Sequence, residues 1–174
     1  MYKSIFIDLD DTVWAFSENA RDTFQDMYDK YHFDRYFRSF EHFYEIYEAR
    51  NVTLWEEYGN RKITKEELNI QRFSYPLLQV GVDDKALVEA YSENFFADII
   101  YKKKLMPHAR EALEYLASRY DLYILSNGFR ELQEQKMRSA GVGEYFKKII
   151  LSEDIGVLKP YPEIFYFAMS ATQS

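Results

Sequence analysis

The sequence predicts an α/β fold in which a core with a parallel sheet carries an inserted α-helical bundle, the cap domain. Three observations lead to this fold class. A continuous apolar segment near the N-terminus is typical of a buried strand, and residues 17–104 then carry only helical signals. After Leu105, helix and strand signals alternate, as they do in the βα units of a parallel sheet. We therefore assign residues 1–16 and 105–174 to the core and residues 17–104 to the cap.

The first strand is predicted over residues 4–8. Its central Ile-Phe-Ile run, residues 5–7, is typical of a strand covered on both faces of a parallel sheet. Asp8 closes the strand, and Asp10 and Asp11 follow at once. Because open parallel sheets bind ligands at the carboxyl ends of their strands, these acids lie where a functional site is expected.

The inserted block is predicted to be a bundle of about four helices. Ser17 and Ser39 are possible N-caps, and Thr64 with Glu67 forms a capping box. Gly81 is a stop signal, and Asp83 is a further start signal. Pro76 falls within the third helix and should end or kink it, because proline lacks a backbone N–H.

The part after Leu105 should supply the other strands and helices of the core. We expect, in order, a helix from Pro107 to Arg119, a strand at 122–125, a helix ending at Gly141, a strand at 148–151 and a helix opened by Pro162. No Gly/Ser/Pro-rich tract separates the helical block from this part, so the block is interpreted as an insertion and not as a linker.

Composition excludes several classes of function. The 174 residues are 47% hydrophobic, which is enough for a compact core. A net charge of -7, without a basic run, argues against a nucleic acid partner, and no segment is apolar enough for a membrane span or a signal peptide. Without cysteine the chain has neither disulfides nor a thiolate metal site. We expect a cytoplasmic protein.

Asp8 and Asp10 are candidates for paired carboxylate chemistry. Residues two apart in an extended segment point the same way, so both could face one ligand. One could accept a phosphoryl group as a nucleophile, and the other could protonate the leaving oxygen and then activate water. A Mg²⁺ ion would relieve their repulsion. The alternative is that these acids only end a strand and begin a turn.

Two later features could meet the same ligand. The turn Ser126-Asn127-Gly128 follows the second predicted core strand and offers a hydroxyl, backbone N–H groups and a helix N-terminus, all suited to phosphate oxygens. Lys159 precedes Pro160 and could direct an ammonium to the same point. Taken singly, these could be an ordinary turn and a solvated lysine.

In this order, the features resemble the haloacid dehalogenase-like superfamily. Its Asp-x-Asp-x-Thr motif is matched by DLDDT at residues 8–12, its second motif by Ser126 in LSNGF, and its third by Lys159 in GVLKPYPEIF. The resemblance covers nearly the whole chain and implies a three-layer Rossmann-like core under a helical cap.

By this resemblance Asp8 is the nucleophile and Asp10 the general acid/base. Ser126, Asn127 and Lys159 would hold phosphoryl oxygens, Lys159 also countering the charge of Asp8. Mg²⁺ would be the cofactor, ligated by the Asp8 carboxylate and the backbone carbonyl of Asp10. Thr12 would support the loop, and Asp11 is left as a turn residue.

The resemblance also narrows the reaction. A halide leaves without a proton, so the second aspartate of the first motif favours phosphate ester cleavage over dehalogenation. The amino-acid sequence around all three motifs resembles that of the YjjG-type noncanonical pyrimidine 5'-nucleotidases. This resemblance implies a nucleoside 5'-monophosphate substrate. A sugar phosphate or another small phosphorylated metabolite is the alternative, and the oligomeric state is left open.

One family feature is missing from the sequence. A fourth motif, an acidic pair on the strand after the last helix, would complete the Mg²⁺ site, and the sequence ends at Ser174. We therefore expect either a fragment whose core is incomplete at the C-terminus or a chain without the full metal site. Glu153 and Asp154 precede the lysine and are not expected to replace the pair. A truncated, non-catalytic binding module is thus the competing hypothesis.

Overall fold

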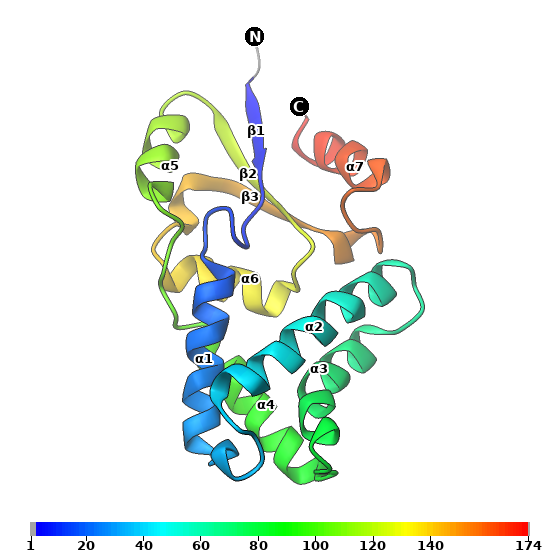
Figure 1. Ribbon diagram of the computed structural model, residues 1–174. Coiled ribbons are helices and arrows are strands. Elements are labelled where there is room, and N and C mark those ends of the chain that lie inside the picture. Colours follow the sequence, from blue (N-terminus) through cyan, green and yellow to red (C-terminus); the bar gives the residue numbers. More distant parts are fainter. Residues whose placement is uncertain (1–2, 174) are drawn as a thin grey trace. The chain divides into compact units, whose positions relative to one another are not determined.

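The computed structural model describes residues 3–173, which divide into two compact units (Figure 1). The first unit combines the residues up to Asn19 with those from Ile99 onward, and the second runs from Ala20 to Asp98. Helix α1, Phe16–Lys30, begins in the first unit and continues in the second. No helix in the described part of the chain is long and apolar enough to cross a membrane.

The first unit contains a three-stranded sheet in the order β1-β2-β3, and both pairings are parallel. The strands are β1 (Ser4–Ile7), β2 (Asp121–Ser126) and β3 (Phe146–Leu151). Each of the three predicted strands is present, although β3 starts two residues earlier than predicted. Because the strands are parallel, their carboxyl ends lie at the same end of the sheet, which is called its carboxyl edge below.

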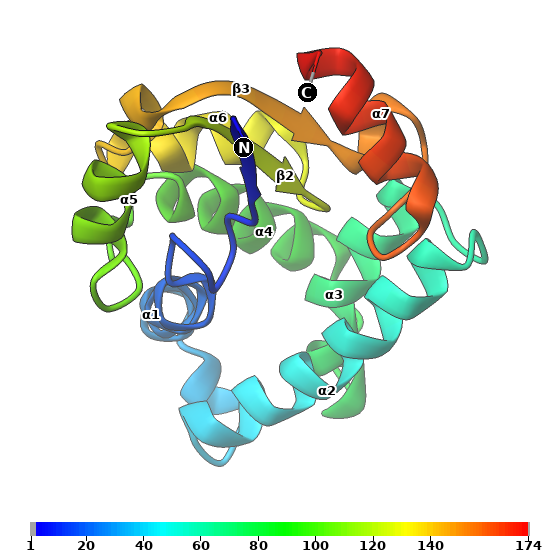
Figure 2. The same cartoon turned by 90° about the horizontal axis from the view of Figure 1, so that it is seen from above.

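Helices cover both faces of this sheet, as Figures 1 and 2 show. The helices are α5 (Ala109–Ala117) and α6 (Arg130–Ser139) on one side and α7 (Pro162–Thr172) on the other. Ile164 and Ala168 of α7 are fully buried in one apolar cluster with Leu125 and Ile150 of the sheet. The predicted fold class is confirmed: an α/β, three-layer core with a parallel sheet.

Strand β1 differs from the prediction in its burial. It is paired with β2 alone among the described strands, so it lies at an edge of the sheet. All four of its residues are half-buried, whereas a strand covered on both faces was expected. The apolar run correctly predicts the strand but not its surroundings.

The second unit is a bundle of helices packed around aromatic rings. Beside most of α1 it contains α2 (Phe40–Gly59), α3 (Lys65–Gln79) and α4 (Lys85–Ile99). Phe24 of α1 lies at the centre, with ring centroids 4.1 Å from Tyr47 and 4.2 Å from Phe95. Two predicted caps are confirmed, because Ser39 caps α2 and Thr64 forms a capping box in α3.

Two predicted helix starts are wrong by one or two residues. Ser17 lies inside α1, because the Asp11 carboxylate accepts hydrogen bonds from the Ser17 N–H at 2.8 Å and from its hydroxyl. Asp11 is therefore a capping residue, not only a turn residue. Helix α4 is capped by Asp84, whose Oδ1 accepts from Leu87 N–H at 3.0 Å, and not by Asp83.

Two helix boundaries also differ from the predictions. Helix α3 continues through Pro76 to Gln79, so the proline does not end the helix, and the alternative of a kink stays a prediction. Helix α5 begins at Ala109, two residues after Pro107, because His108 adopts a left-handed conformation (φ 61°). The predicted glycine stops hold: Gly81 and Gly141 have φ of 80° and 64° just after α3 and α6.

Candidate active site

Two of the predicted site residues meet at the carboxyl edge of the sheet. Asp8 follows β1, and the Lys159 ammonium lies 2.7 Å from its Oδ1. The same Nζ donates to the backbone oxygen of Leu125, near the end of β2, at 2.7 Å. The Asp8 side chain is 40% exposed. This carboxylate is therefore neutralised by a cation and still accessible to a ligand.

Asn127 holds the loop that carries the lysine. Its Oδ1 accepts from the backbone N–H of Lys159 at 2.8 Å, and its Nδ2 donates to the backbone oxygen of Lys159 at 3.1 Å. The amide thus bonds the loop as a backbone strand would. The Asn127 side-chain amide is thus occupied by the backbone of Lys159. That the backbone N–H of Asn127 contacts phosphate stays a prediction.

Asp10 is held by two residues of α6 that the sequence did not indicate. Gln133 Nε2 donates to Asp10 Oδ2 at 2.8 Å, and Lys136 Nζ lies 3.0 Å from Asp10 Oδ1. Gln133 is fully buried and Lys136 is only 3% exposed. The site therefore contains a second aspartate–lysine pair beside Asp8 and Lys159.

One sequence signal could have found these two residues. Gln133 and Lys136 are three apart and adjoin the buried Met137, so they occupy the inner face of the helix. Polar residues on a buried helix face need polar partners, and the helix directly follows the Ser-Asn-Gly turn.

Ser126 is linked to the same network. Its Oγ accepts from Gly128 N–H at 3.0 Å and from Gln133 Nε2 at 2.7 Å. A hydroxyl oxygen that already accepts two hydrogen bonds keeps its own proton for donation. Ser126 is therefore arranged to donate to an acceptor such as a phosphoryl oxygen.

Packing against the Gln133 side chain favours glycine at position 128. A Cβ atom there would lie 2.2 Å from Gln133 Nε2 and 2.5 Å from its Cδ. The absence of a side chain thus allows the Gln133 amide to reach both Ser126 and Asp10.

The loop between Asp8 and α1 is tightly folded. The backbone oxygen of Leu9 accepts from the N–H groups of Val13 and Trp14, both at 2.9 Å, and Trp14 is completely buried. Thr12 Oγ1 lies 3.5 Å from Asp8 Oδ2, at the limit of hydrogen-bonding distance. The loop therefore places the two aspartates on a fixed backbone.

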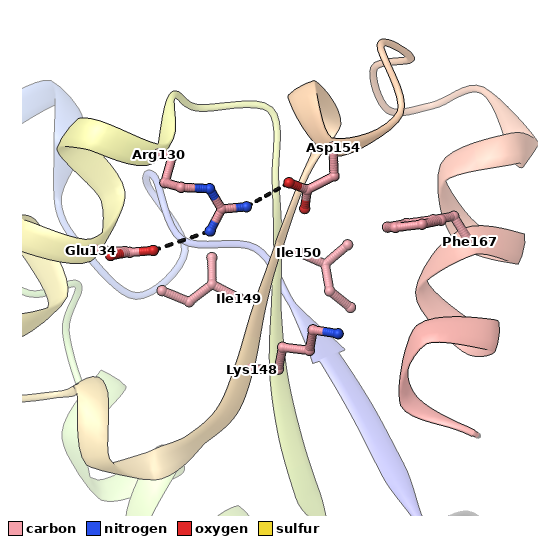
Figure 3. Close-up of a pocket in the computed structure, with 7 residues that line it drawn as sticks. All are labelled: Arg130, Glu134, Lys148, Ile149, Ile150, Asp154 and Phe167. Atoms are coloured by element: carbon pink, nitrogen blue, oxygen red, sulfur yellow. Dashed lines mark hydrogen bonds and ion pairs between the residues drawn. The ribbon is translucent and has the colours of Figure 1, made fainter.

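Glu153 and Asp154 have structural partners. Glu153 Oε1 accepts from Arg130 N–H at 2.9 Å and so occupies part of the helix N-terminus that was expected to face phosphate. Asp154 pairs with the Arg130 guanidinium, which also bonds Glu134 at 3.1 Å (Figure 3).

This ion-pair cluster borders a hollow of about 490 Å³ lined by residues of α6, β3, α7 and the loop after β3. The predicted site residues are not among those that line it. The two cations in its lining, Arg130 and Lys148, are balanced by the carboxylates of Glu134 and Asp154, so the hollow has little attraction for an anion and is not proposed as the site of the predicted chemistry.

The residues present offer two oxygens for a Mg²⁺ ion. They would be a carboxylate oxygen of Asp8, whose side chain is 40% exposed, and the backbone carbonyl of Asp10, since hard oxygen ligands suit this ion. Residues 3–173 contain no group of three or more His, Cys, Asp or Glu placed to hold a metal. Since Mg²⁺ keeps several waters, two protein oxygens fit part of its coordination.

Comparison with known proteins identifies the family. A family model described as haloacid dehalogenase-like hydrolase matches residues 2–173. The pyrimidine 5'-nucleotidase YjjG of Escherichia coli (strain K12) is 32% identical over 126 residues, which are 72% of this chain and 54% of that protein. The pyrimidine 5'-nucleotidase PynA of Streptococcus pneumoniae is 28% identical over 67% of this chain and 48% of its own. The chain thus spans about half the length of these two nucleotidases.

Solved structures agree with this assignment. The crystal structure of the HAD hydrolase YfnB from Bacillus subtilis, bound to magnesium, covers 97% of this chain and 73% of that chain with a TM-score of 0.85 and 25% identity. The structure of the L-2-haloacid dehalogenase of Xanthobacter autotrophicus superposes on this chain with a TM-score of 0.73, and the match covers 100% of this chain and 66% of the dehalogenase chain. At 15% identity, this second similarity concerns the fold alone.

Proposed function

The chain belongs to the family of haloacid dehalogenase-like hydrolases, and from this we propose that the protein is a Mg²⁺-dependent phosphatase. It would cleave a small phosphate monoester through an aspartyl phosphate on Asp8. The proposed site lies in the first unit, at the carboxyl edge of its sheet. We also expect a cytoplasmic location.

The observation that carries this proposal is the engagement of Asp10. Both of its carboxylate oxygens are bonded, one by Lys136 and one by Gln133, and the residue lies two positions after Asp8. An alkoxide leaving group needs a proton, and general acid catalysis typically contributes a factor of about 10² to 10⁴. Loss of a halide needs no proton, so a carefully held second acid supports phosphate ester cleavage.

Each residue then has a distinct role in two steps. An Asp8 oxygen forms a bond to phosphorus while the ester P–O bond breaks, and Asp10, which must carry a proton at this point of the cycle, gives that proton to the leaving oxygen. Water next attacks the aspartyl phosphate, Asp10 takes the proton of that water, and phosphate leaves from Asp8.

The remaining polar groups would act on the phosphoryl oxygens. The Lys159 ammonium and the Ser126 hydroxyl would stabilise their negative charge. When bound, Mg²⁺ would add positive charge at the same oxygens, and the Asp8 carboxylate and the Asp10 carbonyl would hold it.

The proposed substrate is a nucleoside 5'-monophosphate. The support is similarity to two proteins named pyrimidine 5'-nucleotidases, over about half of their length. A panel of nucleoside monophosphates and sugar phosphates, assayed with the product of the complete gene, tests this choice. Preference for a sugar phosphate would reject the nucleotide and keep the phosphatase.

Two variants test the reaction itself. Asp8→Asn should abolish both turnover and the acid-stable phosphoenzyme, because an amide is a poor nucleophile. Asp10→Asn should retain phosphoenzyme formation with p-nitrophenyl phosphate but slow its hydrolysis. Normal turnover by Asp8→Asn, or release of halide from a 2-haloacid without phosphatase activity, would reject the proposal.

A further inference from the structure

We propose that Gln133 and Lys136 are positioning residues of the reaction, which fix the Asp10 carboxylate and the Ser126 hydroxyl relative to each other. The inference rests on the proposed phosphatase function and assigns a role to one face of helix α6. Neither residue would touch the substrate, because each acts through a group that does.

Burial makes Lys136 a fixed point. Its side chain is 3% exposed, and its ammonium lies 4.7 Å and 5.1 Å from the ring centroids of Trp14 and Phe16. A charge buried to this extent is costly unless it is paired, and its carboxylate partner is Asp10 at 3.0 Å. Movement of Asp10 away from this ammonium would remove the carboxylate that is paired with the buried charge.

The donors of Lys136 also determine how the Gln133 amide is oriented. An ammonium only donates, so the amide presents Oε1 to Lys136, at 2.8 Å. Nε2 is then left with two hydrogens, and the structure places Asp10 Oδ2 at 2.8 Å and Ser126 Oγ at 2.7 Å. One amide therefore joins the residue that donates the proton to the residue that binds the phosphoryl group.

This arrangement has a consequence for the reaction. Asp10 follows β1 and Ser126 ends β2, and pairing of these strands positions the two backbones but does not fix the side-chain torsions of Asp10 and Ser126. Helix α6 supplies that constraint: it donates two hydrogen bonds to the Asp10 carboxylate and one to the Ser126 hydroxyl, and a fourth joins Lys136 to Gln133. Displacement of a reacting group by about 1 Å can cost a factor of about 10² in rate.

The test compares leaving groups in the Lys136→Met variant. In this variant kcat/KM, which reports the steps through alcohol release, should fall on the order of 100-fold for a nucleoside 5'-monophosphate, whose leaving oxygen needs a proton. It should fall less than about 5-fold for p-nitrophenyl phosphate, whose leaving group needs little help. A merely structural lysine would lower both values equally, and that outcome would overturn the inference.

A double variant separates positioning from folding. Asp10→Asn with Lys136→Met removes both charges, and adding Lys136→Met to Asp10→Asn should lower kcat/KM less than about 3-fold, because Lys136 acts through Asp10. A full additional loss would contradict the inference. Lys147→Met, which changes a lysine 68% exposed on β3, is the matched control and should leave both substrates unaffected.

The same assays distinguish the two proposals. If the unmodified protein hydrolyses neither substrate with Mg²⁺, the proposed function fails, and this inference fails with it. If the unmodified protein is an active phosphatase and Lys136→Met lowers kcat/KM equally for both substrates, only the inference fails.

Discussion

Among the described residues each unit buries one cationic side chain, and although both cations lie over aromatic rings, only one of them faces a carboxylate. In the first unit Lys136 is 3% exposed and faces the Asp10 carboxylate. In the second unit Arg72 is 4% exposed, and no carboxylate of residues 3–173 lies within ion-pair distance of it. Its guanidinium donates to the Tyr47 hydroxyl at 3.1 Å and lies 5.3 Å and 5.8 Å from the rings of Phe73 and Phe96.

The difference separates two uses of a buried charge. Aromatic faces attract a cation without fixing it to one atom, so Arg72 chiefly fills space and contributes to packing of the helices. A carboxylate fixes an ammonium at one point, and the two charges cannot then be changed independently. We therefore expect the first unit to tolerate loss of its buried cation far less than the second.

The largest expected effect concerns Lys136→Met. Removing the buried Lys136 leaves the Asp10 carboxylate, which is 28% exposed, without its cation, so the free energy of unfolding should fall by about 3 kcal/mol. Adding Asp10→Asn should recover most of that loss, because the remaining amide carries no charge. Urea denaturation of the three variants measures both values. Equal losses in the single and double variants would show that the carboxylate is not what holds Lys136.

A smaller loss is expected for Gly128→Ala. The new Cβ would lie 2.2 Å from Gln133 Nε2, so the amide must leave its position between Asp10 and Ser126. Overpacking of this kind costs about 2 kcal/mol. Gly143→Ala is the matched control, since its Cβ would meet Met137 O at 4.0 Å, an ordinary contact. Similar melting temperatures for the two variants would contradict the steric account.

The helical unit should respond to alkaline pH through Tyr91. Burial raises the pKa of this fully buried tyrosine well above the usual 10.0, and its hydroxyl also bonds the backbone oxygen of Phe73. Above pH 10 the unfolded chain releases the proton and the folded chain keeps it. The contribution of Tyr91 to the free energy of unfolding is fully present below pH 10. Above pH 10 the free energy of unfolding should decline by about 1.4 kcal/mol per pH unit. Denaturation at several pH values should show a shallower decline for Tyr91→Phe. An unchanged slope would show that Tyr91 ionises equally in both states.

The smallest effect is expected for Arg72→Met. Methionine keeps the apolar stem and removes a buried charge whose Nε has no hydrogen-bond partner. The lost contacts and the relieved burial should nearly cancel, so the free energy of unfolding should change by less than about 1 kcal/mol. A loss as large as that of Lys136→Met would show that aromatic rings hold a cation as firmly as a carboxylate does.

The site residues that could be predicted from the sequence share one feature, which is their position at the end of an apolar segment. Asp8, Ser126 and Lys159 stand at the ends of apolar segments, where a polar residue is conspicuous and parallel strands bring distant residues to one edge. The polarity of Gln133 and Lys136, by contrast, looks ordinary in the sequence RELQEQK, because most residues around them are charged or polar. Their three-residue spacing beside Met137 is a weak signal of an inward face, and the orientation of α6 in the structure establishes it.

Capping shows a similar limit. Asp83 and Asp84 are equivalent as signals, and the choice between them depends on which carboxylate reaches the N–H of Leu87. The half-buried state of β1 was not predictable either, because an apolar run reports what a strand could bury and not which neighbours it has.

The short ladder between residues 13–19 and 102–106 also bears on how the chain folds. Ala15 N–H donates to Lys104 O at 3.1 Å, Met106 N–H donates to Val13 O at 2.9 Å, and the Asn19 amide donates to Lys104 O at 2.9 Å. Pairing of β1 with β2 must otherwise close a loop of about 114 residues, and with the ladder formed the effective loop is about 25 residues. The entropic cost of closure then falls by about 1.3 kcal/mol, which makes the encounter of the two strands on the order of ten times more frequent. Once formed, these hydrogen bonds at the base of the insertion therefore favour the pairing of β1 with β2.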